Sequence, residues 1–146
     1  MKNVRDILNS KGDTKIHSVE PGMMVVDALK LMADKMVGAL LVLENGNLVG
    51  VFSERDYARK IALMERSSRT TEIRQVMTSN LICVSPSDTM EFCMELMTDK
   101  HIRHLPVLEG DKLIGMISIG DLVKNIIEDQ KAMIHRLEQY MRGETY

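Results

Sequence analysis

The chain has 146 residues, of which 45% are hydrophobic and 27% charged, a balance typical of a folded globular protein and not of a disordered one. Its 19 Lys and Arg against 21 Asp and Glu give a net charge of −2, so we expect no nucleic acid partner. The longest apolar run, 37–43, is far shorter than the roughly 20 residues of a membrane helix, and the charged N-terminus has no apolar signal core. With only two isolated cysteines, we predict a cytoplasmic protein without membrane contact.

The first half of the chain predicts a β-α-β-β-α unit. A short β-branched segment ends at a proline, which cannot continue a central strand, and apolar residues at i, i+3 and i+4 then indicate a helix. Two apolar strands flank Asn45-Gly46-Asn47, whose residues tolerate the positive φ of a hairpin turn. In order, the expected elements are a strand at 16–19, a helix around 25–32, strands at 39–43 and 48–52, and a helix that begins after Ser53.

The second half repeats the first. A shift of 65 residues aligns Pro21 with Pro86 and Gly50 with Gly115, and it extends to Leu40, Val42, Leu43 and Glu44 on Leu105, Val107, Leu108 and Glu109. This duplication predicts strands at 81–84, 105–108 and 113–117, a helix around 90–97 and a turn at Gly110-Asp111. A further similarity, VRDIL at 4–8 with IRQVM at 73–77, has an offset of 69, so the first repeat carries extra residues at 9–13.

These patterns predict the domain organisation. The first repeat is expected at 1–67, the second at 68–128 and a C-terminal helical tail at 129–146. A half of about 60 residues would be marginally stable alone, so we expect the two pseudo-symmetric halves of this α/β fold to pack together through their sheets.

The last helix is expected to continue from about Asp121 to Arg142. An apolar stripe runs along it among charged residues and is interrupted by the polar Gln130. Such a stripe covers either its own domain or a partner copy, and contact with a second subunit is the favoured interpretation. The stripe consists of Ile126, Ile127, Ile134, Leu137 and Met141.

Two Ser-x-x-Asp sequences, Ser53–Asp56 and Ser118–Asp121, align under the 65-residue shift, each where the second strand of a hairpin ends and a helix begins. Unpaired N–H groups and the helix dipole favour an anion there, and Ser53 and Ser118 could donate hydroxyl hydrogen bonds to a phosphate. Asp56 and Asp121 could each accept two hydroxyls, as a ribose diol requires. The same residues are also those of an ordinary helix cap. On one copy alone the cap is the better interpretation, and the duplication weakens that preference.

The duplicated pattern resembles a tandem cystathionine-β-synthase (CBS) domain pair, the Bateman module. The resemblance extends over about residues 4–127, and the strings SERDYARK (53–60), RHLPVLEG (103–110) and LIGMISIGDLVK (113–124) are especially similar to stand-alone bacterial CBS pairs. It implies a regulatory fold that binds adenine nucleotides in two clefts, each crossed between the repeats. The implied residues of the first cleft are Ser53, Arg55, Asp56, Ile82, Cys83, Ile102, Arg103 and His104, and those of the second are Ser118, Ile119, Asp121, His17, Ser18, Val37, Gly38 and Ala39.

The two clefts are expected to differ in charge. Arg55 lies within the first motif, whereas Gly120 occupies the same place in the second, and Arg103 aligns with Gly38. Arginine binds phosphate through two hydrogen bonds, so the cleft with Asp56 should take the more anionic ligand.

Other chemistry is less favoured. Asp99, His101 and His104 could be drawn as metal ligands, but we expect no metal. Cys83 is more simply a small buried side chain than a redox group. A nucleotide phosphohydrolase would need a metal or a general base beside the phosphate. The acids of the motif are Glu54, Asp56 and Asp121, and the last two are needed for ribose.

The resulting prediction is a non-catalytic energy or redox sensor and a homodimer. AMP is the first candidate ligand, with ADP, ATP, NADH and S-adenosylmethionine as alternatives. The sequence shows no fused enzyme or transporter domain, so the regulated effector is expected to be a separate protein, whose identity the sequence does not indicate. The alternatives are a ligand-free oligomerising scaffold and, least favoured, a metal-dependent nucleotide hydrolase.

Overall fold

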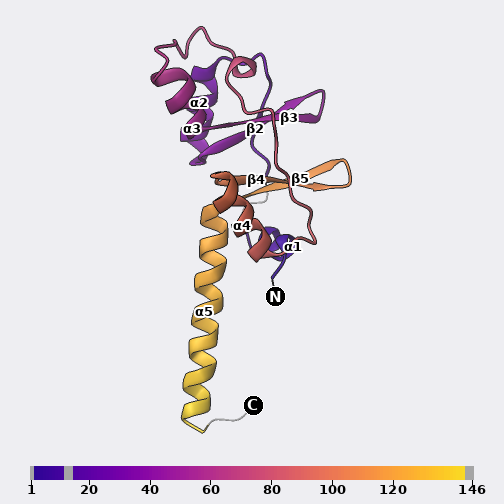
Figure 1. The fold of residues 1–146 in the computed structure, drawn as a ribbon, viewed down its shortest axis with the longest axis vertical. Helices are drawn as coiled ribbons and strands as arrows, with labels where there is room; N and C mark the ends of the chain where they lie inside the picture. The colour runs from indigo at the N-terminus through magenta and orange to yellow at the C-terminus, as the bar shows by residue number, and fades with distance from the viewer. Residues whose placement is uncertain (1, 12–14, 144–146) are drawn as a thin grey trace. The chain divides into compact units, whose positions relative to one another are not determined.

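The computed structural model describes residues 2–11 and 15–143 (Figure 1). Its α/β element order confirms the duplicated plan, with one more helix at the N-terminus. The helices are α1 (Val4–Ser10), α2 (Val25–Lys35), α3 (Glu54–Asp56), α4 (Met90–Lys100) and α5 (Ile119–Met141), with a π-helical turn η1 (Tyr57–Ala62) and a 3-10 turn η2 (Ile73–Gln75). The strands are β1 (Ser18–Val19), β2 (Ala39–Glu44), β3 (Asn47–Ser53), β4 (His104–Glu109) and β5 (Lys112–Ser118).

The chain divides into two compact units. The first-repeat unit holds residues 15–83 and 108–115, and the second-repeat unit holds the described residues of 2–11, 84–107 and 116–143. The boundaries predicted at 67/68 and 128/129 are those of the sequence repeats. As domain boundaries they stay a prediction.

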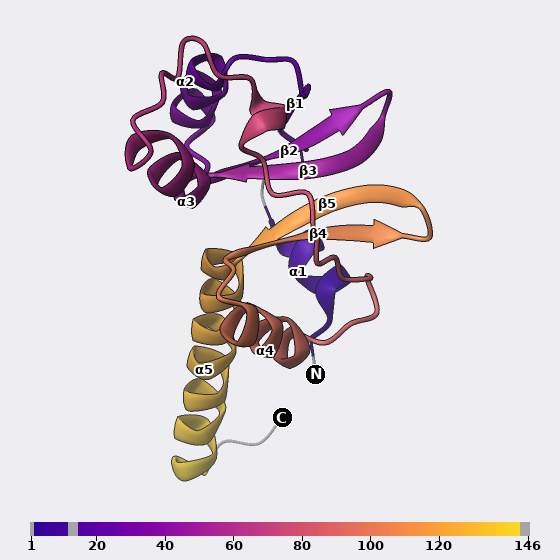
Figure 2. The ribbon, with the colours of Figure 1, turned by 45° about the horizontal axis from the view of Figure 1, so that its top comes forward.

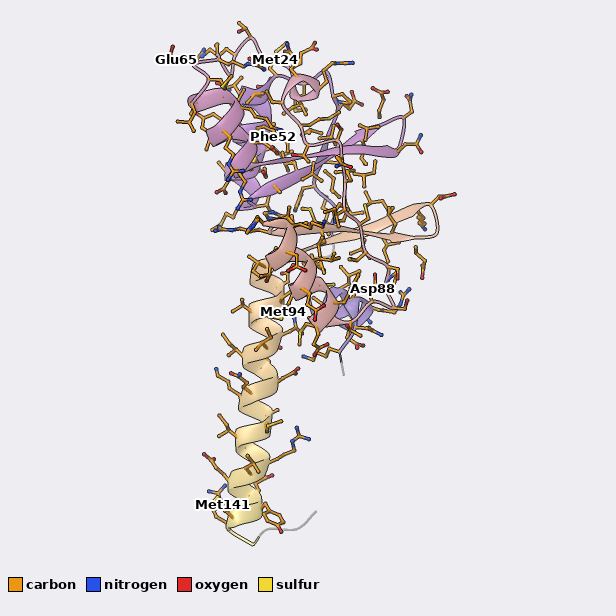
Figure 3. All side chains as sticks on the ribbon, viewed as in Figure 1. Met24, Phe52, Glu65, Asp88, Met94 and Met141 are labelled. Carbon is orange, nitrogen blue, oxygen red and sulfur yellow. The ribbon has the colours of Figure 1, made fainter. Side chains whose placement is uncertain are left out.

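The first-repeat unit is built on a three-stranded sheet. β1 lies parallel to β2, and β2 pairs antiparallel with β3. The hairpin between β2 and β3 turns at Asn45 and Gly46, both with positive φ, as the sequence predicts. Phe52 is fully buried in its core and is labelled in Figure 3. The other buried residues of this core are Val19, Val25, Ala28, Met32, Leu40, Val42, Ile61, Ile73 and Val76.

The second-repeat unit contains α1, α4 and α5. α4 and α2 end in the same way, because His101 and Met36 both take the left-handed conformation just after the helix. The strand predicted at 81–84 is wrong in extent: among the described residues of this segment, only Val84 forms a bridge, parallel to Val107. Pro86 follows within two residues and limits the pairing. The strand predicted at 16–19 is likewise shortened to Ser18–Val19.

The two units exchange their leading segments. At the start of α4, the Met90 N–H donates to the Lys2 carbonyl at 3.1 Å, and at the start of α2, the Val25 N–H donates to the Thr71 carbonyl at 2.9 Å. Lys2 and Thr71 stand 69 residues apart, which is the offset between the two leading segments in the sequence. Each leading segment therefore packs in the compact unit of the other repeat.

Helix α5 confirms the predicted C-terminal extension. Leu122 and Asn125 are its buried residues and lie in its first two turns. Figures 1 and 2 show the C-terminal part of α5 running on beyond α4 and α1, the other helices of its unit. Within the described parts of the chain, no helix is both long and apolar enough to cross a membrane.

Candidate functional site

The first Ser-x-x-Asp sequence forms a complete capping box at the start of α3. The Asp56 N–H donates to Ser53 Oγ at 3.2 Å, and the Ser53 N–H donates to Asp56 Oδ2 at 2.9 Å. The Ser53 hydroxyl also donates to Asp56 Oδ2 at 3.1 Å. The capping interpretation of the motif is thus correct for this structure.

The Asp56 carboxylate has further donors. Its Oδ1 accepts from Thr78 Oγ1 at 2.9 Å and from Lys60 Nζ at 3.0 Å, and Lys60 also donates to the Val76 carbonyl at 3.0 Å. Only 8% of the Asp56 side chain is exposed. Both oxygens are engaged, so a ribose diol could bind here only by displacing one of these partners.

The backbone places Thr78 beside Asp56. Val51 and Thr78 exchange two backbone hydrogen bonds of 2.9 Å, which attach segment 77–78 to β3. A Cβ on the neighbouring Gly50 would lie 2.6 Å from Met77 Sδ and 3.1 Å from the Thr78 carbonyl oxygen. Glycine at this position therefore permits the close approach on which the Thr78–Asp56 hydrogen bond depends.

Other predicted residues lie in the same unit. Ser53 pairs with Ala39 across the β2–β3 ladder, and the Glu54 N–H donates to the Gly38 carbonyl at 3.0 Å. The His17 carbonyl accepts from the Leu41 N–H at 3.2 Å, and Ser18 pairs with Leu41 in the parallel ladder. Gly38 and Ala39 thus adjoin the motif of their own repeat.

The second Ser-x-x-Asp sequence builds the same box at the start of α5. The Asp121 N–H donates to Ser118 Oγ at 3.2 Å, and the Ser118 N–H donates to Asp121 Oδ2 at 2.8 Å. A different lysine approaches this carboxylate: Lys11 Nζ lies 2.9 Å from Asp121 Oδ2 and 2.9 Å from the Met116 carbonyl. The Asp121 side chain is 22% exposed, so water and ligands reach it more readily than Asp56.

Arg103 belongs to the surroundings of this second motif. Its carbonyl accepts from the Ile119 N–H at 2.9 Å, and the residue is exposed. The structure therefore brings the backbone of Arg103 to Ile119, next to Ser118 and Asp121 of the same unit.

The crossed clefts themselves stay predictions. The first combines Ser53, Arg55, Asp56, Ile82 and Cys83 of the first-repeat unit with Ile102, Arg103 and His104 of the second-repeat unit. The second combines Ser118, Ile119 and Asp121 of the second-repeat unit with His17, Ser18, Val37, Gly38 and Ala39 of the first-repeat unit.

Sequence reasoning missed the cations and the hydroxyl that bind the two carboxylates. Lys60 follows Asp56 at i+4, a helical spacing at which opposite charges meet, so that ion pair could have been predicted. Thr78 and Lys11 had no such signal, since they lie 22 and 110 residues from their carboxylates.

Both cysteines have raised pKa values. Burial raises the pKa of the half-buried Cys83 thiol. Burial, with a smaller contribution from the Asp88 carboxylate, raises the pKa of Cys93 from 9.0 to about 11. The thiolate is the reactive form, so both thiols are poorly suited to redox chemistry at neutral pH.

We expect the Cys93 thiol to make stability fall between pH 9.0 and about 11. The unfolded thiol ionises from pH 9.0 upward while the native thiol stays protonated, so stability present below pH 9.0 is lost as the pH approaches about 11. The loss should stay below about 2.7 kcal/mol, which is the full value of a two-unit difference between the folded and unfolded pKa. Urea unfolding across this pH range measures it, and Cys93→Ala should show a smaller decline. Equal slopes for the two proteins would contradict the assignment.

The three residues that could be drawn as metal ligands lie around the end of α4 and the start of β4. Asp99 lies in the last turn of α4, His101 ends that helix and His104 begins β4. Over residues 2–11 and 15–143, no group of three or more His, Cys, Asp or Glu side chains is arranged to hold a metal ion.

Known proteins share both the sequence and the fold. The family model described as "CBS domain" matches residues 4–63 and 73–128. The mitochondrial CBS domain-containing protein CBSX3 of Arabidopsis thaliana is 38% identical over 148 residues, covering 96% of this chain and 72% of that protein.

Solved structures agree with this match. A protein with CBS domains from Burkholderia ambifaria MC40-6 superposes with a TM-score of 0.86 at 50% identity, covering 88% of this chain and 96% of that one. A hexameric CBS-CP12 protein from bloom-forming cyanobacteria gives a TM-score of 0.72 at 26% identity, covering 83% of this chain and 70% of that one. CBS pairs are in general regulatory, ligand-binding modules. The two matches of the family model, on the two repeats that build the duplicated capping boxes, show that this chain belongs to the CBS-domain family.

Proposed function

We propose that the chain is a non-catalytic regulatory module that binds an adenine nucleotide, with AMP as the first candidate. The observation that carries this proposal is the duplicated junction itself. Ser53–Asp56 and Ser118–Asp121 present the same hydroxyl, carboxylate and helix start at the end of a strand in both units. These groups suit the phosphate and the ribose hydroxyls of a nucleotide.

Of the two motifs, the second is the better candidate for ribose binding. Asp121 is partly exposed, and its partner Lys11 lies directly after α1. The partly exposed Lys11 amine can turn toward a phosphate without a change in the core. Asp56 is buried, and both of its oxygens already accept hydrogen bonds. The extra cation Arg55 in the first motif, where the second has Gly120, favours a more anionic ligand at the first.

The structure and the comparisons each provide one observation for choosing between a ligand-free scaffold and a ligand-binding regulator. An oligomerising scaffold is favoured by the apolar residues exposed along α5. The family pair is in general regulatory, and the relative in Arabidopsis thaliana is named only as a CBS domain-containing protein. A scaffold needs no ligand, whereas a regulator binds its ligand in one state better than in another.

The test is nucleotide binding by chain stripped of bound nucleotides. AMP, ADP, ATP, NADH and S-adenosylmethionine are compared by thermal shift and calorimetry, and a ligand at 100 times its Kd should stabilise the fold by about 2.7 kcal/mol. Asp121→Ala should weaken binding at least about tenfold, the loss of roughly 1.4 kcal/mol.

Asp88→Ala is the matched control for Asp121→Ala. Asp88, labelled in Figure 3, accepts the Ser85 N–H at 2.8 Å in the same unit, just as Asp121 accepts the Ser118 N–H. Its Ser-x-x-Asp sequence precedes α4 and is not one of the two motifs proposed to bind nucleotide. It should bind nucleotide like the unchanged chain. Absence of any nucleotide-dependent shift would favour the scaffold, and turnover of nucleotide with a divalent metal would favour the hydrolase.

A further inference from the structure

The apolar side chains on α5 form a stripe, interrupted at Gln130, that its own unit leaves exposed. From Ile127 to Met141, every residue of the helix is exposed except the half-buried Gln139. The exposed fractions are large for apolar side chains: 45% at Val123, 46% at Ile127, 55% at Ile134, 56% at Leu137 and 84% at Met141. Figure 3 shows the side chains projecting from this helix down to Met141.

The stripe has the spacing of a coiled coil. Val123, Ile127, Gln130, Ile134, Leu137 and Met141 follow one another at alternating steps of four and three residues. In a heptad, this spacing puts isoleucine at two a positions, 127 and 134, and leucine at one d position, 137. We call these six residues the α5 seam.

The seam faces away from the unit that anchors the helix. Leu122 and Asn125 are buried, and Asn125 is held by Lys2 Nζ at 3.0 Å. At about 100° per residue, the seam points roughly 130° from the side that carries these two residues. A shallow, open groove along the first part of the seam is lined by Ile119, Gly120, Val123, Lys124, Ile127, Glu128 and Lys131. The anchoring contacts thus leave the seam accessible to another helix.

The charges around the seam favour a second copy over a lipid surface or a nucleic acid. From Ile119 to Arg142 the helix carries Lys124, Lys131, Arg136 and Arg142 against Asp121, Glu128, Asp129 and Glu138, so it has no net charge. Helices that bind anionic membranes are rich in Lys and Arg on their polar face. A neutral helix with an apolar heptad can pair with itself without repulsion.

The polar residue within the seam selects the orientation. In a parallel pair in register, Gln130 meets Gln130 of the second copy, and the two amides can bond to each other. The charged flanks Lys131 and Glu138 then lie beside Ile126 and Met133 of the second copy. In an antiparallel pair, Gln130 faces Ile134 and Lys131 faces Lys131. Isoleucine at a and leucine at d also favour two parallel strands.

We propose that the α5 seam pairs with the seam of a second copy as a parallel, two-stranded coiled coil. This interaction does not involve the nucleotide-binding motifs. The proposal of a coiled coil therefore does not depend on the proposed regulatory function. It extends the expectation of a homodimer to a specific surface and orientation.

The first test is the oligomeric state of the full chain. Sedimentation equilibrium should show a dimer, and Ile134→Lys with Leu137→Lys should weaken dimerisation by at least about 100-fold, because two ammonium groups would enter an apolar interface. Ala132→Lys with His135→Lys is the control: it adds a similar charge to the same turns outside the seam and should leave the dimer intact. All four positions are exposed in one chain, so the fold should be unchanged by circular dichroism.

The second test concerns orientation. Met141→Cys should form a disulfide-linked dimer on mild oxidation, whereas the unchanged chain should not. In an antiparallel pair, the two introduced thiols would lie about 27 Å apart at 1.5 Å per residue and could not bond. A monomeric chain at about 100 µM, a dimer that survives the double lysine variant, or a dimer that Met141→Cys does not cross-link would each overturn the proposal.

Discussion

Ile7→Ala is expected to lower the free energy of unfolding by about 2–5 kcal/mol, the range for truncating a fully buried aliphatic side chain. Ile7 is on α1, near the N-terminus, and none of its surface is exposed. It packs in the second-repeat unit, with segments 84–107 and 116–143, although the sequence places it in front of the first repeat. The loss should therefore appear far from residue 7 in the sequence.

Urea unfolding measures the size of this effect, and native-state hydrogen exchange measures its location. Amides of 84–107 should lose protection before those of 15–83. Leu8→Ala, on the neighbouring half-buried residue, is the control and should cost less. Val76→Ala is the counterpart at the offset of 69, and it should loosen 15–83 instead. A loss of protection confined to 15–83 in Ile7→Ala would contradict the exchange of leading segments.

Asp56→Ala is expected to cost about 2–3 kcal/mol, because it removes the carboxylate half of the capping box and the charged acceptor of several donors. The Ser53 N–H and the Thr78 hydroxyl lose their acceptor, and the Lys60 amine keeps its hydrogen bond to the Val76 carbonyl but loses the carboxylate. Thr78 and the partly exposed Lys60 can turn to water, which limits the loss. The melting temperature should fall by roughly 5–10 °C.

Two controls separate burial from charge in this experiment. Glu54→Ala removes an exposed carboxylate from the same short helix and should change stability little. Asp121→Ala removes the equivalent carboxylate of the second motif, which is more exposed, and should cost about 1 kcal/mol. Equal effects of Asp56→Ala and Glu54→Ala would show that the buried contacts contribute little. Because Asp56 stabilises the fold, Asp121→Ala is the cleaner variant for measuring nucleotide binding.

Several features were predictable because they depend on residues close together in the chain. The hairpin turn at Asn45 and Gly46 follows from residues that accept positive φ. The two capping boxes join residues three apart, Ser53 to Asp56 and Ser118 to Asp121. The strands predicted at 16–19 and 81–84 were overestimated, since their apolar pattern does not report whether a neighbouring strand is available along the whole segment.

The sequence by itself determined the duplication, the β-α-β-β-α order, the caps and the length of α5. Periodicity and local hydrogen bonds depend on residues that are close together in the chain, so they can be recognised without the tertiary structure. Only the tertiary structure decided that α1 packs with the second repeat and that Lys11 reaches Asp121 across 110 positions. It also decided that Asp56 is buried among Thr78 and Lys60, whereas Asp121 stays partly exposed. Two motifs with the same serine and aspartate thus differ in accessibility, because the partners of the two carboxylates come from segments that differ between the repeats.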